Sequence, residues 1–417
     1  MGEQRAKAAQ RQFQEAAAAF SRRQYAQALA LLERGAAESE PQSQNLLGVM
    51  LLNGMGLTAD PRRAADLFEA AAQDDLREAR YNLANLKFHG LGTASDELGA
   101  QQQLLASARA GHRPALRALG FIYRAAAAES DWARLSMQCF RQAAEAGDPL
   151  ALHAYGLSLL QGHGASADPA AAVSCFAAAA RAGVYLAPLR LAQAQAAAGG
   201  TASASAAPER VLPLEACELS ALPPAVPARE VAFMSEHRAA LDAHLQDHLI
   251  NVAAPQLMPS NVVDPETGAA MKSELRTSHS MHFQPSMYDV AVFLALRRIA
   301  RIAGLPASHA EPLGVLRYGP GQEYRPHYDY YSDDRHQAQR ISTVFVYLND
   351  VEEGGGTDFP RLGVKVDPEQ GKAVRFLNCD AAGQPNPETL HAGLPVIRGE
   401  KWLATLWFWD RPFDWFR

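Results

Sequence analysis

The stretch "YGPGQEYRPHYDYY" at residues 318–331 places His327 two positions before Asp329 in an aromatic and proline-rich segment. Alternate residues of a β-strand point to the same face of a sheet, so this imidazole and this carboxylate could bind one object. A metal ion is the first candidate, because imidazole and carboxylate groups are both common metal ligands. The stretch therefore predicts a strand that carries two ligands of a metal site.

The H-x-D pair is a weak signal by itself. A chain with 13 histidines and ordinary aspartate usage contains about one such pair by chance, so a third ligand is needed. The segment "TLHAGLPVIRGEKWLATLWFW" supplies His391, which lies 64 residues after His327. Two histidines and one carboxylate form the facial triad of non-haem iron sites, which leaves positions open for a cosubstrate and dioxygen.

Lys401 follows His391 by ten residues and lies in an otherwise apolar run. A lysine on an apolar strand requires an anion that compensates its ammonium group, and a dicarboxylate bound at the iron would provide one. By the period of two, one face of this strand carries Lys401, Leu403, Thr405, Trp407 and Trp409. If Lys401 faces a pocket, both tryptophans face it as well.

The second half of the chain has the pattern of a β-rich domain. Two helical stretches, at 236–249 and 287–304, come first. Short β-rich runs follow at 314–319, 342–350, 364–368, 372–378, 395–399 and 401–409. Turn residues separate these runs, which predicts a sandwich or jelly roll with helices packed outside it. The glycine-rich "EEGGGTDF" is interpreted as a tight turn, because no Gly-Lys-Ser/Thr follows it.

The first half repeats itself with a period of 36 residues. The small residues at this period are Gly48, Ala84, Gly120 and Gly156, and the same period relates Asp60, Asp96 and Asp168, and also Gly111, Gly147 and Gly183. Each unit contains two apolar stripes separated by a turn, which predicts two antiparallel helices whose close approach the small residues permit. The third unit departs from the pattern at "YRAAAAESDW".

These patterns divide the chain into three parts. Residues 1–191 are expected to form an all-α helical-repeat solenoid, whose first helical pair at 16–35 is an additional unit or a cap. Residues 192–210 lose the apolar stripe and gain Gly, Ser and Thr, which indicates a flexible linker. Residues 211–417 are expected to form the β-rich domain.

Composition narrows the possible partners and location. The net charge of −6 and the pI of about 6.1 favour neither a nucleic-acid partner nor an anionic membrane. The cysteines are far apart in sequence and have the spacing of neither a disulfide framework nor a zinc site: Cys139, Cys175, Cys217 and Cys379. A charged start without an apolar core segment completes the expectation of a cytoplasmic protein.

Several motifs together resemble those of the prolyl 4-hydroxylase-like Fe(II)/2-oxoglutarate dioxygenases. They are the H-x-D pair, the distal histidine, the lysine ten residues later, the tyrosine nine residues before the first ligand and "GGGTDF", in the order of that family, within about residues 257–410. The repeats over about residues 43–184 resemble Sel1-like repeats, which are related to tetratricopeptide repeats. The resemblance implies a double-stranded β-helix, or jelly roll, with flanking helices as the C-terminal fold.

The resemblance also implies roles for individual residues. His327, Asp329 and His391 would hold Fe(II), and Lys401 and Tyr318 would contact the distal carboxylate of 2-oxoglutarate. Thr343 would lie in a strand that lines the cosubstrate. Fe(II), the cosubstrates 2-oxoglutarate and dioxygen, and ascorbate as the reductant are therefore expected.

Trp407, Trp409 and Arg276 are candidate substrate contacts. A flat aromatic ring suits a proline ring or a peptide backbone, although tryptophan on a late strand is more often part of a core, by roughly two to one. His244 and His248 stand four residues apart on an expected helix without an acidic or cysteine partner, so an ordinary amphipathic face is preferred to a metal site there.

Three functions remain open on the sequence. The first is hydroxylation of a prolyl residue in a peptide or protein that the repeats engage. The second is hydroxylation of a free amino acid or another small molecule, with the repeats serving assembly. The third is a binding adaptor with an idle barrel, which the complete set of ligands and the cosubstrate lysine disfavour, because buried charges are costly without their ions.

Overall fold

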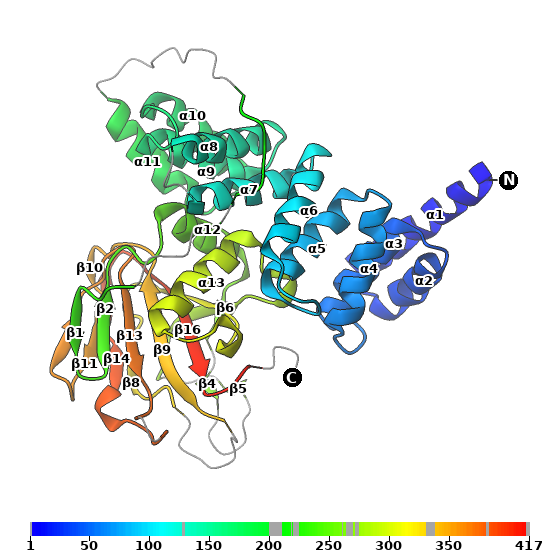
Figure 1. The fold of residues 1–417 in the computed structure, drawn as a ribbon. Helices are drawn as coiled ribbons and strands as arrows, with labels where there is room; N and C mark the ends of the chain where they lie inside the picture. Colours follow the sequence, from blue (N-terminus) through cyan, green and yellow to red (C-terminus); the bar gives the residue numbers. More distant parts are fainter. Residues whose placement is uncertain are drawn as a thin grey trace. The chain divides into compact units, whose positions relative to one another are not determined.

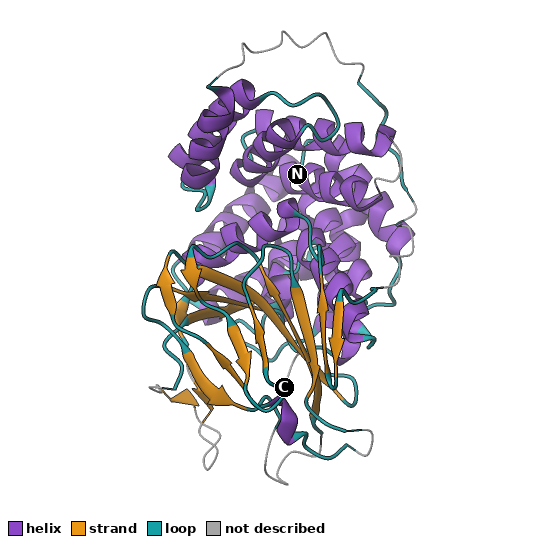
Figure 2. Cartoon of the chain, turned by 90° about the vertical axis from the view of Figure 1, so that its left-hand side faces the viewer, coloured by secondary structure: helices purple, strands orange, loops and turns teal. Residues whose placement is uncertain are grey.

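The computed structural model describes residues 2–126, 130–199, 211–217, 219, 225–260, 262–263, 270–271, 275–330, 338–380 and 383–413. The first of two compact units comprises Met1–Ser220 and Gln284–Phe293, and the second comprises Ala221–Phe283 and Leu294–Arg417. The first unit is helical and the second contains the β-sheets (Figures 1 and 2). An N-terminal helical-repeat domain and a C-terminal jelly roll are thus confirmed.

The first unit is a succession of helices joined by short turns. Its helices are α1 (Gly2–Ser21), α2 (Tyr25–Ala37), α3 (Pro41–Leu52), α4 (Pro61–Gln73), α5 (Arg77–His89), α6 (Glu97–Arg109), α7 (Arg113–Ala126), α8 (Ser130–Glu145), α9 (Pro149–Gln161), α10 (Pro169–Arg181) and α11 (Ala187–Ala198). The helical pair expected upstream of the repeats is α1 and α2. The unusual turn of the third unit includes residues 127–129, which lie outside the described residues.

The repeated aspartates begin the second helix of their units. Asp60, Asp96 and Asp168 each accept a hydrogen bond from the backbone N–H three residues later, at 2.9, 2.8 and 2.9 Å. Such caps satisfy N–H groups that have no partner within the helix. The repeated glycines end helices, as at Gly111 and Gly147, where φ is 77° and 89°. The repeated aspartates therefore mark the starts of helices, and the repeated glycines mark the ends.

The small-residue register keeps paired helices close together. A Cβ atom added at Gly48 would lie 2.7 Å from a ring carbon of Phe68, and one added at Gly120 would lie 2.5 Å from Phe140. The two phenylalanines are fully buried and themselves follow the period of 36. The repeats that carry a glycine at this position, Gly48, Gly120 and Gly156, therefore pack a phenylalanine ring directly against a helix backbone.

The structure differs from the expected linker in two ways. Helix α11 continues to Ala198, so the beginning of the segment 192–210 is helical, as its alanine content allows. Residues 211–217 belong to the first unit, which moves the domain boundary from 210 to 220. Residues 200–210 lie outside the described part of the chain.

The second unit contains two facing β-layers (Figure 2). The larger sheet has the order β1-β2-β13-β9-β16-β7-β6-β3 and the smaller has the order β12-β11-β14-β8. Their strands are β1 (Arg229–Val231), β2 (Met234–His237), β3 (Met258–Pro259), β6 (His279–His282), β7 (Gly314–Tyr318), β8 (Tyr324–His327), β9 (Arg340–Tyr347), β11 (Thr357–Phe359), β12 (Val364–Val366), β13 (Ala373–Leu377), β14 (His391–Gly393) and β16 (Lys401–Trp409).

Two short pairs complete the strands. They are β4 (Val262–Val263) with β5 (Ala270–Met271), and β10 (Glu353–Gly354) with β15 (Val396–Arg398). The expected glycine-rich turn includes β10, where Gly354 and Gly355 have φ of 78° and 70°. A Cβ atom on Gly354 would lie 2.5 Å from the carbonyl oxygen of Pro395, so both its conformation and its surroundings favour glycine.

The core of the second unit lies between the two sheets. Apolar side chains from the larger sheet, such as Leu316 and Phe345, pack in one buried cluster with Phe359 and Val364 from the smaller sheet. Antiparallel layers with such a shared interior are the architecture that the alternating strands predict. The pocket described below shares Leu316 and Phe345 with this cluster.

The chain also contains the helices α12 (Ala243–Ala253) and α13 (Val290–Ala303) and short 3₁₀ turns at Ala254–Gln256, Pro285–Met287, Ala307–His309 and Pro387–Thr389. The helix expected at 236–249 begins later than predicted. Glu236 and His237 pair with β13, and Asp242 caps α12 by accepting from the N–H groups of His244 and Leu245.

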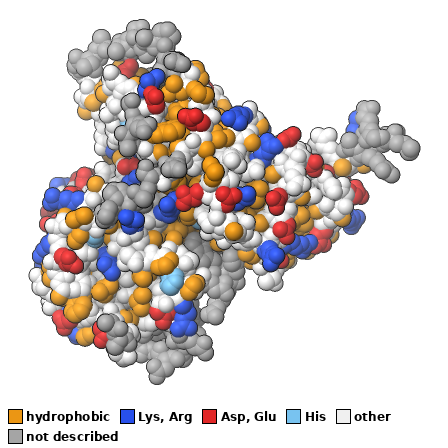
Figure 3. Space-filling model, in the orientation of Figure 1, with side chains coloured by type: hydrophobic (Ala, Val, Ile, Leu, Met, Phe, Trp, Pro, Cys, Tyr) orange, Lys and Arg blue, Asp and Glu red, His pale blue; other side chains and the backbone are white. Residues whose placement is uncertain are grey.

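Acidic and basic side chains are interspersed with hydrophobic ones over the face that Figure 3 shows. Among the helices of the described residues, none combines the length and the apolar character that crossing a bilayer requires. The large hydrophobic side chains that are exposed include Leu98, Leu189 and Ile397. They come from separate elements, as is usual for isolated surface hydrophobics.

We expect Gly120→Ala to destabilise the repeat domain by about 1–3 kcal/mol, because the new methyl group would overlap the Phe140 ring. The matched control is Gly199→Ala, whose Cβ atom would be 3.6 Å from its nearest neighbour. Thermal unfolding followed by circular dichroism measures both changes. Equal melting temperatures for the two variants would contradict the packing argument.

Candidate metal centre and cosubstrate pocket

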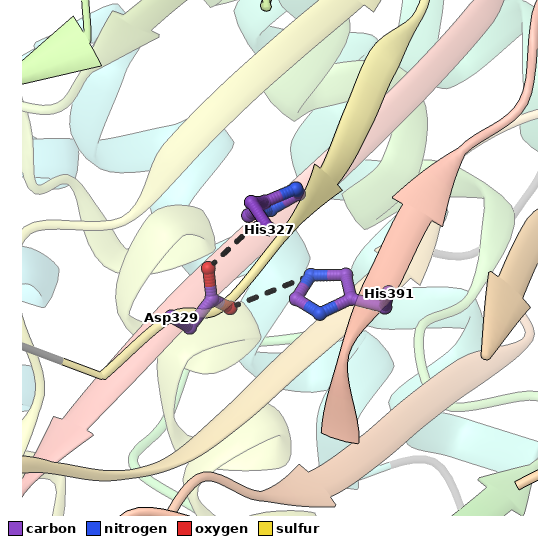
Figure 4. Close-up of side chains that lie close together, drawn as sticks. All are labelled: His327, Asp329 and His391. Carbon is purple, nitrogen blue, oxygen red and sulfur yellow. Dashed lines mark ion pairs between the residues drawn. The ribbon is translucent and has the colours of Figure 1, made fainter. Parts of the chain in front are cut away.

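Three side chains with metal-binding groups meet in the second unit. His327 ends β8, Asp329 follows it by two residues, and His391 begins β14. The antiparallel pairing of these strands places the Cα atom of His391 opposite that of His327. Asp329 lies beyond the end of β8 rather than within the strand, yet its carboxylate turns toward the two imidazoles (Figure 4).

The three groups are close enough to share one ion. One ligand atom from each residue lies within 4.8 Å of the other two. The Nε2 atom of His327 is 3.6 Å from Asp329 Oδ1, and Nε2 of His391 is 3.8 Å from Oδ2 (Figure 4). The exposed fractions of the side chains are 16% for His327, 9% for Asp329 and 8% for His391. The donor set is that of a 2-His-1-carboxylate iron site.

The two imidazoles are held by backbone carbonyls. Nδ1 of His327 is 2.9 Å from the carbonyl oxygen of Arg325, and Nδ1 of His391 is 3.1 Å from that of Thr389. An N–H at Nδ1 that donates to a carbonyl leaves the Nε2 lone pair available for a metal. The same two nitrogens that point toward Asp329 are therefore the ones prepared as ligands.

Aromatic rings pack against both imidazoles, and burial keeps that of His327 uncharged. The Tyr324 ring stacks on His327 with 3.4 Å between ring centroids, and Phe376 lies 4.6 Å from the ring of His391. Burial, with a further contribution from His391, lowers the pKa of His327 to about 3. A neutral imidazole at neutral pH is the form that binds a metal.

The carboxylate of Asp329 is oriented by a short chain of hydrogen bonds. Thr343 on β9 donates its hydroxyl to Asp329 Oδ2 at 2.8 Å, and the Asn378 amide donates to the Thr343 hydroxyl at 2.9 Å. Burial alone would raise the pKa of Asp329, but the nearby imidazoles of His391 and His327 hold it below its ordinary value. Asp329 is therefore ionised and fixed in position.

A pocket of about 500 Å³, open to solvent, contains the three ligands. Its lining residues come from both sheets and from the segment before β6: Arg276, Leu316, Tyr318, Tyr324, His327, Asp329, Thr343, Phe345, Thr357, His391, Gly393, Lys401, Leu403, Thr405 and Trp407. Lys401, Leu403, Thr405 and Trp407 are alternate residues of β16. The common face expected on this strand therefore exists from 401 to 407.

Lys401 is the unusual residue of this pocket. Its side chain is fully buried, and its Nζ atom has no hydrogen-bond partner among the described residues. Burial lowers the pKa of Lys401 to about 7. A buried ammonium group without a partner is costly, so the pocket is complementary to an anion that would reach Nζ.

Tyr318 is the cross-strand neighbour of Lys401. The lysine Nζ atom lies 4.4 Å from the centroid of the Tyr318 ring, a cation–π distance. A Cβ atom at Gly393 would lie 3.4 Å from the same Nζ, so glycine leaves room beside the ammonium group. The tyrosine and the glycine thus bound the space where an anion would lie.

The candidate substrate contacts take different positions. Arg276 lies 5.1 Å from the Tyr324 ring centroid at the rim formed by the segment before β6, and Trp407 lines the pocket under the guanidinium of Arg340. Trp409 follows a register shift in β16 and donates its indole N–H to Glu311 at 2.7 Å. This ion-paired environment, not a free ring face, is what the structure gives Trp409.

His244 and His248 are buried on α12, and they join no group of three or more metal-binding side chains in the described residues. Sequence reasoning missed Asn378, Tyr324 and Gly393. Asn378 follows a strand that pairs with β9, so only the register of that pair reveals its contact with Thr343. Gly393 does have a sequence signal, since it lies two residues after His391 on the same strand face.

The donor set and the pocket agree with comparisons to known proteins. Residues 313–409 match the 2OG-Fe(II) oxygenase superfamily, and residues 41–76, 77–112, 114–148 and 149–184 match the Sel1 repeat. The C-terminal part of the chain belongs to the 2OG-Fe(II) oxygenase superfamily. The matched oxygenase region contains His327, Asp329, His391 and Lys401, and the four Sel1 repeats include the units of the period of 36 residues.

Relatives of the oxygenase domain include plant and viral enzymes. The chain is 38% identical over 183 residues to probable prolyl 4-hydroxylase 3 of Arabidopsis thaliana, a match that covers 39% of this chain and 63% of the relative. A viral collagen prolyl hydroxylase of Paramecium bursaria Chlorella virus-1, solved with 2OG, is 31% identical and matches with a TM-score of 0.36 over 43% of this chain and 97% of that one. The chain thus spans less than two thirds of the curated plant relative.

The repeats also have a solved relative. A Sel1 repeat protein from Oxalobacter formigenes is 27% identical, with a TM-score of 0.41 over 45% of this chain and 74% of that chain. The four matched repeats extend from 41 to 184. The repeat family expected from about residue 43 to residue 184 is confirmed.

Thr343→Val should weaken divalent metal binding to the oxygenase domain by about 10–100-fold, because the variant removes the hydrogen bond that orients Asp329. Anaerobic titration with Co(II), followed by visible absorption, measures the dissociation constant. Thr343→Ser keeps the hydroxyl and should retain the affinity of the unmodified protein. Equal affinity in the valine and serine variants would show that the hydroxyl does not position the carboxylate.

The free energy of unfolding of the metal-free protein should rise with pH above about 7. The unfolded chain keeps the Lys401 proton up to its ordinary pKa of 10.5, whereas the folded chain loses it near 7. The unfolded state then binds one more proton, so stability increases by about 1.4 kcal/mol per pH unit from this group.

Guanidinium denaturation at pH 7, 8 and 9 measures this slope. In the Lys401→Met variant, the free energy of unfolding should rise less steeply with pH. The difference in slope corresponds to one proton, because the methionine side chain does not titrate. The matched control is Lys365→Met, at an exposed position of β12. The same pH slope in the unmodified chain and in Lys401→Met would contradict the assignment.

Proposed function

We propose that the chain is an Fe(II)- and 2-oxoglutarate-dependent dioxygenase that hydroxylates a prolyl residue in a peptide or protein. The observation that carries the proposal is the fully buried Nζ of Lys401, which lies in the same pocket as His327, Asp329 and His391 and has no hydrogen-bond partner within the described part of the chain. A metal triad alone suits several reactions, but a cation within the same cavity selects an anionic cosubstrate. A dicarboxylate can contact the metal through one end and Lys401 through the other.

The residues present fit the expected groups. His327, Asp329 and His391 would hold Fe(II), and Lys401 with Tyr318 would hold the distal carboxylate of 2-oxoglutarate. When bound, the iron and its cosubstrate supply the activation of dioxygen and the oxidation of a substrate C–H bond. The protein residues supply orientation: Thr343 and Asn378 fix the Asp329 carboxylate, and two backbone carbonyls fix the imidazoles.

Burial defines what the pocket excludes. Tyr318 and Thr343 are each 2% exposed, and Phe345 and Leu403 add apolar walls. An apolar enclosure strengthens the attraction between Lys401 and an anion, because the effective dielectric constant is lower than in water.

The substrate class is proposed from the relatives and from the pocket rim. Two relatives are a probable prolyl 4-hydroxylase and a collagen prolyl hydroxylase. Trp407 offers an aromatic lining and Arg276 a cation at the same pocket, which suits a proline ring with its peptide carbonyls. The Sel1 repeats would bind a protein partner. Ascorbate as the reductant and a cytoplasmic location, which the sequence spacing of the cysteines favours, are parts of the same proposal.

Succinate formation with Fe(II), 2-oxoglutarate and ascorbate tests the proposal. Proline-rich peptides should stimulate it and free proline should not, and His327→Ala should abolish it. Lys401→Met should raise the KM for 2-oxoglutarate about 10–100-fold, the equivalent of one lost charge-assisted contact, while Lys365→Met should leave it unchanged.

The outcomes separate the alternatives. Turnover stimulated by free proline or another small molecule, but not by peptides, would replace the peptide substrate with a small one. Metal binding without 2-oxoglutarate turnover under any of these conditions would contradict the dioxygenase. Mass spectrometry of the peptide identifies the oxidised residue, and an unmodified proline in a consumed peptide would contradict prolyl hydroxylation.

A further inference from the structure

An extended segment of the chain lies on the repeat domain. Residues 211–217, "VLPLEAC", contain neither helix nor strand and belong to the first unit. Figure 1 shows this green segment running beside the helices of the third repeat. The exposure of its side chains alternates, with residues 211, 213 and 215 exposed and residues 212, 214 and 216 partly buried. The alternation is that of an extended strand with one face on the helices.

Two glutamine side chains hold the backbone of this segment at both ends. Gln138 of α8 donates its amide N–H to the carbonyl oxygen of Leu212 at 2.9 Å and accepts from the Leu212 N–H at 2.8 Å. Gln101 of α6 makes the same pair of bonds with Cys217, at 2.8 and 2.9 Å. Each primary amide therefore pairs with the N–H and C=O of a single residue, as a neighbouring strand would.

A tyrosine holds the middle of the segment in the same way. The Tyr123 hydroxyl of α7 donates to the carbonyl oxygen of Glu215 at 2.6 Å and accepts from its N–H at 3.1 Å. Arg109 donates to the carbonyl oxygen of Leu214 at 3.3 Å. Tyr123 also stacks on Trp132 with 5.5 Å between ring centroids and 12° between ring planes, which fixes the phenol ring.

These side chains are buried, so their hydrogen bonds cannot be replaced freely by water. The exposed fractions are 2% for Gln101, 4% for Gln138 and 0% for Tyr123. A buried polar group without a partner costs about 1–3 kcal/mol. The faces of α6, α7 and α8 therefore present a row of donor and acceptor pairs that a polypeptide backbone satisfies.

We propose that Gln101, Tyr123 and Gln138 form a binding site for an extended polypeptide of a partner protein, and that residues 211–217 are its tethered occupant in the free protein. The proposal does not rest on the proposed oxygenase activity. The partner would displace the chain's own segment and form the same backbone hydrogen bonds. Because the tether gives the segment an effective concentration of about millimolar, only a partner of higher affinity or concentration replaces it.

The contacts define the chemistry of this partner. The positions equivalent to Leu212, Glu215 and Cys217 must carry an N–H, so they cannot be proline. The position of Pro213 requires no donor, and proline is accepted there. Apolar residues suit the positions of Leu212 and Leu214, which are partly buried. The site would recognise mainly backbone N–H and C=O groups, so many peptide sequences with this spacing could bind.

A fluorescein-labelled peptide with the sequence of residues 209–219, carrying Cys217→Ser, tests the site by fluorescence anisotropy with the full chain. The Leu212→Pro/Cys217→Pro variant of the protein removes the two backbone N–H groups that Gln138 and Gln101 accept from. This variant should bind the peptide at least 10-fold more tightly than the unmodified protein, because its own segment competes less. A peptide that contains the same two prolines should not bind.

Matched groove variants decide whether the glutamines are the site. In the Leu212→Pro/Cys217→Pro background, Gln101→Ala/Gln138→Ala should weaken peptide binding at least 10-fold, whereas Gln102→Ala, at the exposed neighbour on α6, should not. Equal peptide binding by the Gln101→Ala/Gln138→Ala variant and by the Gln102→Ala control would overturn the proposal. So would a peptide affinity that the double proline variant leaves unchanged.

A second measurement avoids any effect of the variants on folding. In the unmodified protein, hydrogen–deuterium exchange should be slow at the amides of residues 212, 215 and 217. Millimolar free peptide should accelerate their exchange, because it displaces the segment from the helices. Exchange that stays slow at saturating peptide would show that residues 211–217 are a fixed part of the fold and would overturn the proposal.

Discussion

The pairing of β14 with β8 is the constraint on which the candidate centre depends. It places His391 opposite His327 across an antiparallel ladder, so the two imidazoles are neighbours before any metal binds. The carboxylate needs a different support because Asp329 lies beyond the strand. The hydroxyl of Thr343 supplies it from the opposing sheet. The centre therefore forms only when both layers of the jelly roll are assembled. Its geometry depends on how the two sheets pack against each other.

Lys401 applies a second constraint from the middle of the larger sheet. Its strand lies between β7 and β9, and Lys401 itself pairs with Tyr318 of β7. The buried ammonium group lowers the stability of the empty domain, and an anion would offset this cost. A domain selected for stability alone would have an apolar side chain here. The lysine would thus link the binding of an anion to the stability of the fold.

Much of this arrangement follows from the sequence, because its signals are periodic or chemically specific. The period of 36 residues predicts the repeats, and the structure gives its physical reasons in the aspartate caps and in the packing of Gly120 on Phe140. The triad and Lys401 were predicted from residue type and spacing. Asn378 was not, because its contact with Thr343 depends on the register of two strands. The segment 236–237 was predicted as helix, but its tertiary pairing with β13 overrides the apparent helical pattern. The position of residues 211–217 on the first unit has no signal in the sequence, since only the assembled helix faces bring Gln101 and Gln138 together.

One face of β16 carries Lys401, Leu403, Thr405 and Trp407. It fixes the distance between the lysine and the tryptophan. Trp407 lies six positions after Lys401, so at about 3.3 Å per residue the two Cα atoms stand roughly 20 Å apart along the strand. Substitutions at the tryptophan end can therefore alter which molecules fit without moving the lysine end. Such a division would let the selectivity at one end of the pocket change while the anion-binding group at the other end stays in place.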